Sequence, residues 1–262
     1  MLSDFTMVSH MFPDRPDLKV YPVADVHLGA AEHMKSEWEA FCKKVLEDPN
    51  AYLILAGDLI NNATKTSVSN VFEETMRPRD QKTRMCELLE PIRDRILCIV
   101  NGNHERRNKD VDNDIGYDIA CKLDIEERFR QNVCFLKIQM GDRAKNTCGS
   151  SRPTYVIVVT HGAGGGMLTG GAVNRAERFG YVMNGADALI LGHTHKPFIT
   201  QPSQIKIDAR NGQVTLQPFK VISVTSWLQF SGYAVQKMLN PTSFAPQCMT
   251  LMGKEKKILV SM

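Results

Sequence analysis

IVNGNHERRN, residues 99–108, passes from an apolar run directly into a dense set of polar side chains. A glycine ends the run, and Asn103, His104 and Glu105 then follow in direct succession before two arginines. In layered α/β proteins, ligands gather beyond the carboxyl ends of the strands. The stretch therefore predicts that a buried strand delivers functional side chains to a site at its end.

Similar apolar runs recur along the chain, separated by segments with helical spacing. They are LKVYPVAD (18–25), AYLILAGD (51–58), RILCIVNG (95–102), TYVIVVTHG (154–162) and ADALILGHTH (186–195). Continuous apolar runs of this length suit strands that are covered on both faces. Apolar residues at helical spacing predict helices over residues 36–46, 80–89, 114–129 and 173–182. This alternation predicts an α/β fold with a layered sheet core.

The C-terminal part of the chain is richer in strand signals. Two alternating arms flank Asn211-Gly212 in QIKIDARNGQVTLQPF, which predicts a β-hairpin. KVISVTSW (220–227) and KKILVSM (256–262) read as further strands, and residues 141–153 as an exposed hairpin tip. Because no linker is visible, we predict a single domain over residues 1–262. Its motif core covers about residues 19–200, and a β-rich extension over about residues 201–262 completes the sheets.

Composition excludes several classes of protein. The charge of +3 on 262 residues is too small to indicate nucleic-acid binding by itself, although it leaves a local basic groove open. The first residues lack the pattern of a signal peptide, and no apolar run reaches 18 residues, so we expect no membrane association. None of the seven cysteines forms a C-x-x-C pair. Free thiols in a reducing compartment fit this pattern, which predicts a cytoplasmic protein.

Each apolar run ends in a cluster of possible metal ligands. The clusters are Asp25-Val26-His27, Gly57-Asp58, Gly102-Asn103-His104-Glu105, His161-Gly162 and Gly192-His193-Thr194-His195, and they contain five of the seven histidines. Carboxylate, amide and imidazole groups suit Mn, Fe, Zn or Ni. Positions i and i+2 of an extended segment share a face, so we expect each D-x-H or H-x-H pair to reach one ion. The glycines permit tight turns and close backbone approach.

Taken singly, each cluster has a simpler explanation. A D-x-H pair is common by chance, Asp58 could cap a following helix, and G-N-H-E could be a turn. His161 could be an ordinary strand-end histidine. Five such clusters, each at the end of a predicted strand, favour a shared metal site.

The ordered set D-x-H, G-D, G-N-H-E, H-G and G-H-T-H resembles the calcineurin-like metallophosphoesterase superfamily over residues 25–195. The resemblance implies a four-layer α–β–β–α sandwich with two metal ions at the carboxyl ends of the strands. It assigns the first ion to Asp25, His27 and His195 and the second ion to Asn103, His161 and His193, with Asp58 bridging the two.

The last motif indicates a branch of this superfamily. Its G-H-x-H form is similar to phosphodiesterases and repair nucleases more than to protein serine/threonine phosphatases. The phosphatases also carry an arginine just before G-N-H-E and an R-G pair after G-D. Here those places hold Val100-Asn101 and residues 59–62, LINN, which argues against protein phosphatase activity.

The resemblance also implies a mechanism. Two divalent ions, with Mn²⁺ expected first and Fe, Zn or Ni left open, would hold a hydroxide that attacks phosphorus in line with the leaving oxygen. His104 would act as general acid on the leaving group or as a cationic stabiliser. Glu105 would orient His104 or cap a helix. Arg106 and Arg107 would contact substrate phosphate or lie on a solvated charged face.

The predicted function is therefore a dinuclear metal-dependent phosphoester hydrolase, and a phosphodiesterase before other kinds. A phosphomonoesterase and a DNA or RNA nuclease remain alternatives, although the basic stretch RPRDQKTR (77–84) is weak and lies beside acids. All seven ligand positions are filled, which disfavours a non-catalytic module, while a regulatory metal-binding protein stays open. The expected partner is a phosphoester substrate, either nucleotide or nucleic acid. Nothing in the sequence indicates the oligomeric state.

Overall fold

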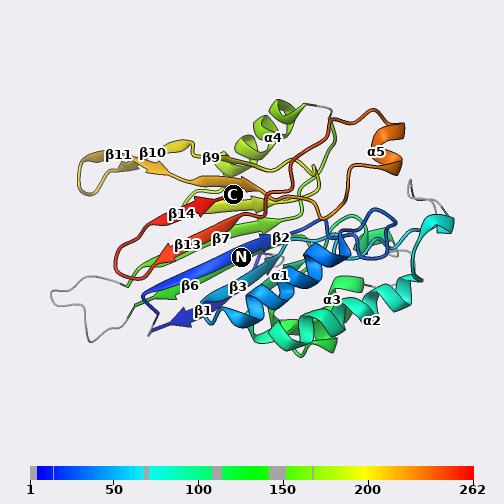
Figure 1. The fold of residues 1–262 in the computed structure, drawn as a ribbon. Helices are drawn as coiled ribbons and strands as arrows, with labels where there is room; N and C mark the ends of the chain where they lie inside the picture. The colour runs from blue at the N-terminus through cyan, green and yellow to red at the C-terminus, as the bar shows by residue number, and fades with distance from the viewer. Residues whose placement is uncertain are drawn as a thin grey trace.

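The computed structural model describes residues 5–13, 15–65, 67, 71–107, 114–141, 152–166 and 168–262. Two six-stranded sheets pack face to face, and helices cover their outer faces (Figure 1). Residues 142–151, most of the predicted tip at 141–153, lie outside the described residues.

The first sheet carries the first three predicted strands. In spatial order its strands are β14 (Ile258–Ser261), β13 (Cys248–Met252), β2 (Asp17–Val23), β3 (Ala51–Leu55), β4 (Ile96–Val100) and β5 (Phe129–Arg130). The strands from β2 to β5 run parallel. Their carboxyl ends therefore lie at one edge of the sheet.

The second sheet carries the other two predicted strands. In spatial order it contains β1 (Met7–Phe12), β6 (Val133–Met140), β7 (Thr154–Thr160), β8 (Ala188–Leu191), β12 (Lys220–Ser223) and β9 (Phe198–Thr200). β7, β8 and β12 run parallel, so they also share one carboxyl edge.

Helices form the two outer layers. The first sheet is covered by α1 (Lys35–Glu47), α2 (Pro78–Leu89) and α3 (Ile115–Lys122), and the second by α4 (Thr169–Val182). Shorter elements are η1 (Val71–Glu73), η2 (Glu90–Arg95), η4 (Glu126–Arg128) and α5 (Gly232–Gln236). None of the helices in the described residues has the length and apolar character needed to cross a membrane.

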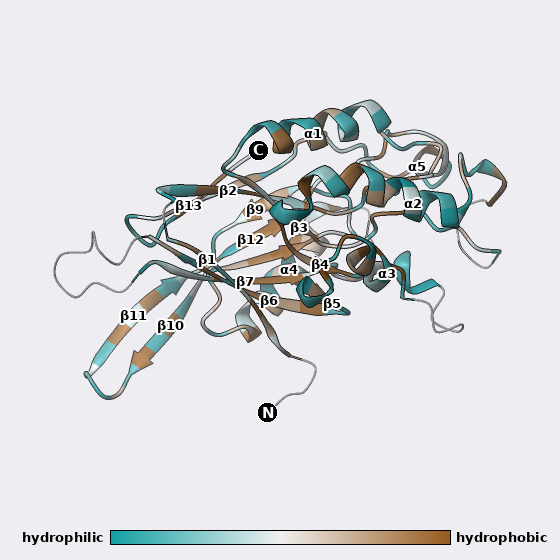
Figure 2. Ribbon diagram, turned by 90° about the horizontal axis from the view of Figure 1, so that it is seen from below, coloured by the Kyte–Doolittle hydropathy of each residue, from teal (hydrophilic) through white to brown (hydrophobic). Residues whose placement is uncertain are grey.

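Alternation along the strands divides the core between these layers. In β3, Leu53 and Leu55 pack against the helical layer with Trp38, whereas Ile54 faces the second sheet. In β8, Ile190 faces the first sheet and Leu189 packs under α4. Each fully buried aliphatic side chain contributes about 1.5–3 kcal/mol. The resulting order of layers confirms the predicted α–β–β–α sandwich, whose strands form the apolar interior in Figure 2.

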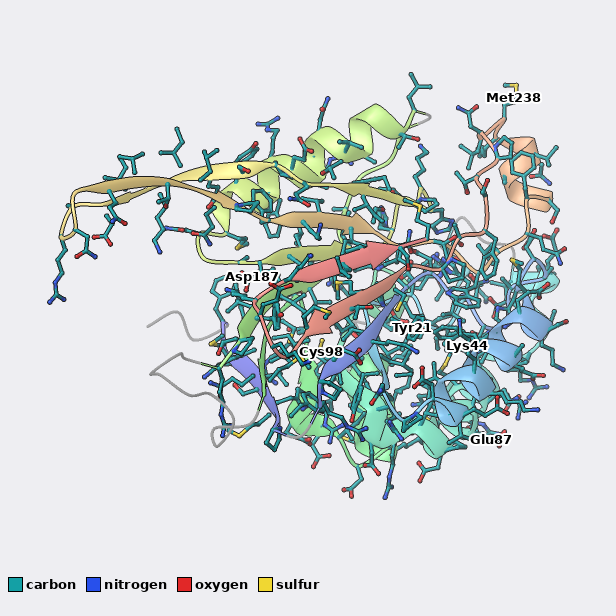
Figure 3. The ribbon with its side chains drawn as sticks, turned by 60° about the vertical axis from the view of Figure 1, so that its left-hand side comes forward. Tyr21, Lys44, Glu87, Cys98, Asp187 and Met238 are labelled. Atoms are coloured by element: carbon teal, nitrogen blue, oxygen red, sulfur yellow. The ribbon has the colours of Figure 1, made fainter. Side chains whose placement is uncertain are left out.

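The C-terminal residues enter both sheets. β12 lies between β8 and β9, and β13 pairs with β2. Asp187, labelled in Figure 3, accepts a hydrogen bond from the Val156 amide at 2.8 Å and pairs with Lys256 at 2.7 Å. These contacts join the end of the chain to β7 and β8, while the single-domain boundaries stay a prediction.

The structure differs from the sequence-based elements in two respects, the end of one helix and a set of unpredicted strands. The helix predicted over residues 114–129 ends at Lys122, because Asp124 adopts φ +58° and the Ile125 amide closes the last turn on the Ala120 carbonyl, as in a Schellman cap. The strands β1, β5, β6, β9 and β13 were not predicted.

The hairpin at Asn211-Gly212 is confirmed. β10 (Ser203–Asp208) and β11 (Gln213–Pro218) pair antiparallel and form a two-stranded sheet of their own. The hairpin extends away from the sandwich in Figure 2. Its apolar side chains form two cross-strand pairs, Ile205 with Leu216 and Ile207 with Val214, and all four are at least 70% exposed.

Candidate metal centre

The loops that follow β2, β3 and β4 are bound to one another by backbone hydrogen bonds. The Asp25 amide donates to the Gly57 carbonyl at 3.1 Å, and the His27 amide donates to the Asp58 carbonyl at 3.0 Å. His161, which follows β7 in the second sheet, places Nδ1 2.8 Å from the Ala56 carbonyl. The predicted clusters therefore meet where the carboxyl edges of the two sheets adjoin.

Most of the predicted ligands have a left-handed backbone. Positive φ occurs at five of the seven, Asp25 (54°), His27 (47°), Asp58 (51°), His193 (67°) and His195 (54°). Such angles are uncommon outside glycine and cost about 1–3 kcal/mol each. The D-x-H and H-x-H pairs were predicted to share one face of an extended strand, and this argument is wrong because their backbone is not extended. These residues lie beyond the strands and turn toward the centre through positive φ.

Two glycines lie where one loop of the centre passes directly against another. A Cβ on Gly102 would overlap the backbone and carboxylate of Asp58. A Cβ on Gly192 would overlap Ala24 and the Asp25 carboxylate. Only glycine lets the loops come together at this spacing.

One group of donors joins Asp25, His27 and His195. Asp25 Oδ1 lies 3.2 Å from His195 Nε2 and 3.8 Å from His27 Nε2. The two histidine Nε2 atoms are 3.2 Å apart. All three donor atoms lie within 4.8 Å of one another, which is the spacing of ligands around one ion.

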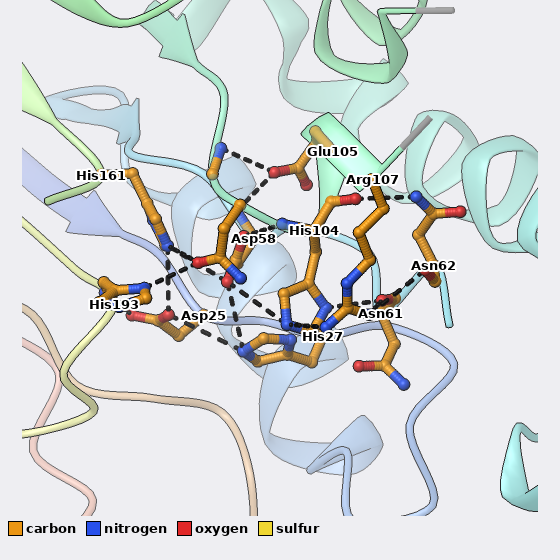
Figure 4. A network of polar contacts seen from close by, with 12 residues as sticks. Asp25, His27, Asp58, Asn61, Asn62, His104, Glu105, Arg107, His161 and His193 are labelled. Atoms are coloured by element: carbon orange, nitrogen blue, oxygen red, sulfur yellow. Dashed lines mark hydrogen bonds and ion pairs between the residues drawn. The ribbon is translucent and has the colours of Figure 1, made fainter. Parts of the chain in front are cut away.

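A second group joins Asp58, His161 and His193. Asp58 Oδ2 lies 3.2 Å from His161 Nε2, and the three donor atoms again lie within 4.8 Å of one another. Asn103 Oδ1 lies 3.1 Å from His161 Nε2 and 2.7 Å from His193 Nδ1. Figure 4 shows Asp58, His161 and His193 close together. His193 and His195 therefore fall in different groups, contrary to the expectation that H-x-H reaches one ion.

The two groups adjoin at the Asp58 carboxylate. Asp58 Oδ2 also lies 3.9 Å from His27 Nε2, a member of the first group. A third group within the same limit contains His27, Asp58 and His104, so His104 lies at ligand distance although it was not predicted as a ligand.

The donor set fits divalent cations. Asp25 Oδ1 is buried and, despite its 3.2 Å separation from His195 Nε2, accepts no hydrogen bond of good geometry from the described residues, so a cation would satisfy it. Burial favours the neutral form of both Asp25 and Asp58, but the adjacent histidines lower the pKa of each carboxyl group below its usual range. Despite burial, Asp58 raises the pKa of His161 to about 9. A proton there offsets the buried negative charge, as a metal ion would.

His104 contacts Asp58 but faces an unexpected partner. Its amide donates to Asp58 Oδ1 at 2.8 Å, and its Nδ1 lies 2.6 Å from the Asn61 carbonyl. Arg107 Nη2 lies 2.8 Å from His104 Nε2. Because the guanidinium can only donate, Nε2 accepts and Nδ1 carries the proton. Burial, then the nearby His27, lower the pKa of His104 to about 3.

The two arginines of the opening stretch diverge. Arg107 lines the cavity above the donor groups and also donates to the Asn61 carbonyl at 2.8 Å. Arg106 instead donates to the carbonyls of Asn101 at 3.0 Å and Gln131 at 3.3 Å. Its guanidinium is engaged by the scaffold, which gives the predicted substrate contact no support.

Glu105 has neither of the predicted roles. Its buried carboxylate accepts hydrogen bonds from the amides of Asp58, Leu59 and Gly102 at 2.8 Å each. Burial, then Asp58, raise the pKa of Glu105 to about 7. It therefore holds the loop that carries Asp58.

Sequence reasoning missed Asn61 and Asn62, although they lie only three and four residues after Asp58. The Asn61 carbonyl binds His104 and Arg107, and Asn62 Nδ2 donates to the His104 carbonyl at 2.7 Å. The signal was two adjacent asparagines in the loop after β3, and asparagine tolerates the φ of +44° that Asn62 adopts.

The donor groups open into a cavity of about 770 Å³. Beyond them, its walls include the charged side chains of Arg107, Arg175 and Lys196 and the apolar side chains of Leu228 and Phe230. The cavity is large enough for a small organic ligand.

Comparison with known proteins places these features in a family context. Residues 18–197 match the sequence model of a family described as calcineurin-like phosphoesterase, and this stretch contains all five clusters. Among solved structures, the chain is similar to a conserved uncharacterised protein from Streptococcus pneumoniae, described as a predicted phosphoesterase. The identity is 11%, the TM-score is 0.37, and the match covers 94% of this chain and 98% of that chain. No curated protein matches the sequence.

Proposed function

Because this chain belongs to the calcineurin-like phosphoesterase family and is a metal-dependent phosphoesterase, we propose that it hydrolyses phosphodiesters at a centre of two divalent ions. The observation that carries the proposal is the pair of donor groups that adjoin at Asp58 and open into the large cavity. A diester needs room for a second ester group beside the reacting phosphorus, and the cavity extends past the donor groups toward Leu228 and Phe230.

The chain's own residues fit this role. Asp25, His27 and His195 would hold one ion, Asn103, His161 and His193 the other, and Asp58 would bind both. When bound, two such ions would lower the pKa of water and offset the charge that develops on the phosphoryl oxygens. Mn²⁺ is the proposed metal, with Fe, Zn or Ni as alternatives. A cytoplasmic location stays a prediction.

His104 and Arg107 are proposed to act on the substrate. His104 lies 3.7 Å from Asp58 Oδ2 through its Nε2 atom, within reach of a leaving-group oxygen beside the centre. Arg107 donates to that same Nε2 and lines the cavity, so its guanidinium can bind a phosphoryl oxygen. We assign His104 to the leaving group as general acid or cationic stabiliser, a role that requires Arg107 to leave Nε2 so that this atom can take up a proton. We assign Arg107 to phosphate binding.

A paired assay tests the proposal. Purified protein is stripped of metal, reloaded with Mn²⁺ and assayed with bis-p-nitrophenyl phosphate and with p-nitrophenyl phosphate. We expect faster hydrolysis of the diester, and loss of both metal and hydrolysis in Asp58→Asn. A preference for the monoester would identify a phosphomonoesterase instead.

A second variant separates the enzyme from a regulatory metal-binding protein. In His104→Ala we expect unchanged metal content and a loss in hydrolysis of about 10²–10⁴-fold, as for removal of a general acid. Unchanged hydrolysis would show that His104 has no role in the reaction.

A further inference from the structure

The cavity continues past the proposed metal ligands to two basic side chains, Arg175 and Lys196. Arg175 comes from α4 and Lys196 follows His195, and both line the cavity. Arg175 Nη1 donates to the Ala163 carbonyl at 2.9 Å, and Lys196 donates to the Gly166 carbonyl. The side chains of Arg175 and Lys196, which come from separate elements, therefore both bind the loop over residues 163–166, where three of the four residues are glycine.

Neither cation is neutralised by a carboxylate among the described residues. Elsewhere basic side chains do find such partners, as Lys19 does with Asp48 and Arg84 with Glu39. Arg107 differs as well, because Asp58, Glu74 and Glu105 all act electrostatically on it. Within the described part of the chain, the direct contacts that compensate the charge of Arg175 and Lys196 are therefore carbonyl oxygens.

The backbone at these cations leaves room for a ligand. Gly164 and Gly166 adopt φ of +86° and +155°, which side-chain-bearing residues rarely do. A Cβ at Gly165 or Gly166 would meet no atom within 4 Å, so space is open beside the loop. An anionic group could therefore approach the two cations and the loop together.

We propose that Arg175 and Lys196 form a second anion subsite, which binds a further phosphoryl group of a small substrate. This inference rests on the proposed function, since the scissile phosphoryl group would lie at the metal centre. Two charge-assisted donors suit a phosphoryl group's several acceptor oxygens. The substrate class is thus a small molecule with at least two phosphoryl groups.

A small molecule fits the cavity better than a nucleic-acid strand. A volume of about 770 Å³ suits a nucleotide-sized ligand. Glu32 and Glu74 also line the cavity, and a continuous polyanion would be repelled by them. Phe230, which is 47% exposed, offers an aromatic face to a base or other planar group.

The test measures binding to the full-length Mn²⁺-loaded protein by ligand-induced increase in Tm, at constant free Mn²⁺. The probes are AMP, ADP, ATP and adenosine 3′,5′-bisphosphate, which sample several spacings between phosphoryl groups. We expect at least one of the last three to bind about 10–100-fold more tightly than AMP. Arg175→Gln and Lys196→Gln should each remove most of that gain. Arg178→Gln on the same helix, outside the cavity, is the matched control and should keep it.

Three results would overturn the subsite. The first is equal binding of all four probes. The second is a gain in affinity that survives in the Arg175→Gln/Lys196→Gln double variant. The third is binding of hexathymidylate, through the same two residues, that is tighter than the binding of any of the four probes. Hydrolysis of bis-p-nitrophenyl phosphate is followed in parallel. A protein that cleaves no phosphoester yet keeps the Arg175-dependent gain supports the subsite and overturns the proposed function. A protein that cleaves the diester but shows no Arg175-dependent gain in binding supports the proposed function and overturns the subsite.

Discussion

The guanidinium of Arg107 donates to Nε2 of His104 across 2.8 Å, three residues along the same turn. The same guanidinium binds the Asn61 carbonyl, which also accepts from His104 Nδ1. The imidazole is therefore held at both nitrogens. A phosphoryl oxygen that drew Arg107 away would release Nε2 toward the cavity, so the two residues are expected to act together.

Replacement of Arg107 should affect turnover more than folding. Lysine keeps the positive charge but lacks the two guanidinium nitrogens with which Arg107 binds the Asn61 carbonyl and His104 Nε2 at the same time. For Arg107→Lys we expect kcat/KM to fall about 10–100-fold, with unchanged metal content. The matched control is Arg106→Gln, whose wild-type guanidinium binds scaffold carbonyls. The control should lower Tm while kcat/KM stays within about threefold, and equal losses of kcat/KM in both variants would contradict the assignment.

Replacement of Glu105 should destabilise the loop that carries Asp58. Each carboxylate oxygen of Glu105 accepts two amide hydrogens, and glutamine would place a donor against two of them. In Glu105→Gln we expect Tm to fall by about 5–10 °C in thermal unfolding. Glu87→Gln, at an exposed helix position where the carboxylate pairs with Arg84, should change Tm by less than about 2 °C. A Tm of Glu105→Gln equal to wild type would mean that the loop does not depend on the carboxylate.

A methyl group at Gly102 should weaken metal binding through Asp58. The added Cβ would overlap the Asp58 carboxylate and force it to move. For Gly102→Ala we expect about 10–100-fold weaker Mn²⁺ binding in a metal titration, as for loss of a group that positions a ligand. Gly171→Ala in α4, where the Cβ meets open space, should keep wild-type affinity. Equal affinities in the two variants would contradict the packing argument.

His10 should make stability depend on pH away from the centre. Its ring lies 2.8 Å from the Leu97 carbonyl. Burial lowers the pKa of His10 below 6.5, and the positive charge of Arg128 lowers it further, although the Leu97 carbonyl and Glu127 act in the opposite direction. The unfolded chain then binds the proton more readily, so the folded state loses stability as pH falls below about 6.5. Relative to His10→Gln, the wild type should lose up to about 1.4 kcal/mol of unfolding free energy per pH unit there. Urea unfolding at pH 7.5 and 5.5 checks this, and a constant difference would refute it.

The sequence was sufficient to predict the layered fold and the meeting of the clusters. Continuous apolar runs such as residues 51–55 mark strands buried on both faces, and parallel strands bring their carboxyl ends to one edge. β6 escaped prediction because its buried residues alternate with Lys137 and Gln139, which breaks the apolar run. The early end of α3 depends on the left-handed Asp124, a conformation that the helical spacing does not reveal.

Contacts between distant segments could not be predicted. Glu105 was expected to orient its neighbour His104, but its partners lie up to 47 residues away at Asp58 and Leu59. Arg106 and Arg107 are adjacent in sequence, and only the fold directs one to the scaffold and the other to the cavity. The path by which Asp25 and His27 reach the centre likewise depends on backbone angles that residue identity alone does not fix.

The left-handed ligands have a consequence for laboratory evolution of this protein. At Asp25, His27, Asp58, His193 and His195, glycine would relieve about 1–3 kcal/mol of backbone strain per position. A library screened for heat resistance in a chelating buffer would therefore enrich replacements at these five codons. Its most robust clones would be chains that have lost their metal, because at these positions robustness and chemistry are selected in opposite directions.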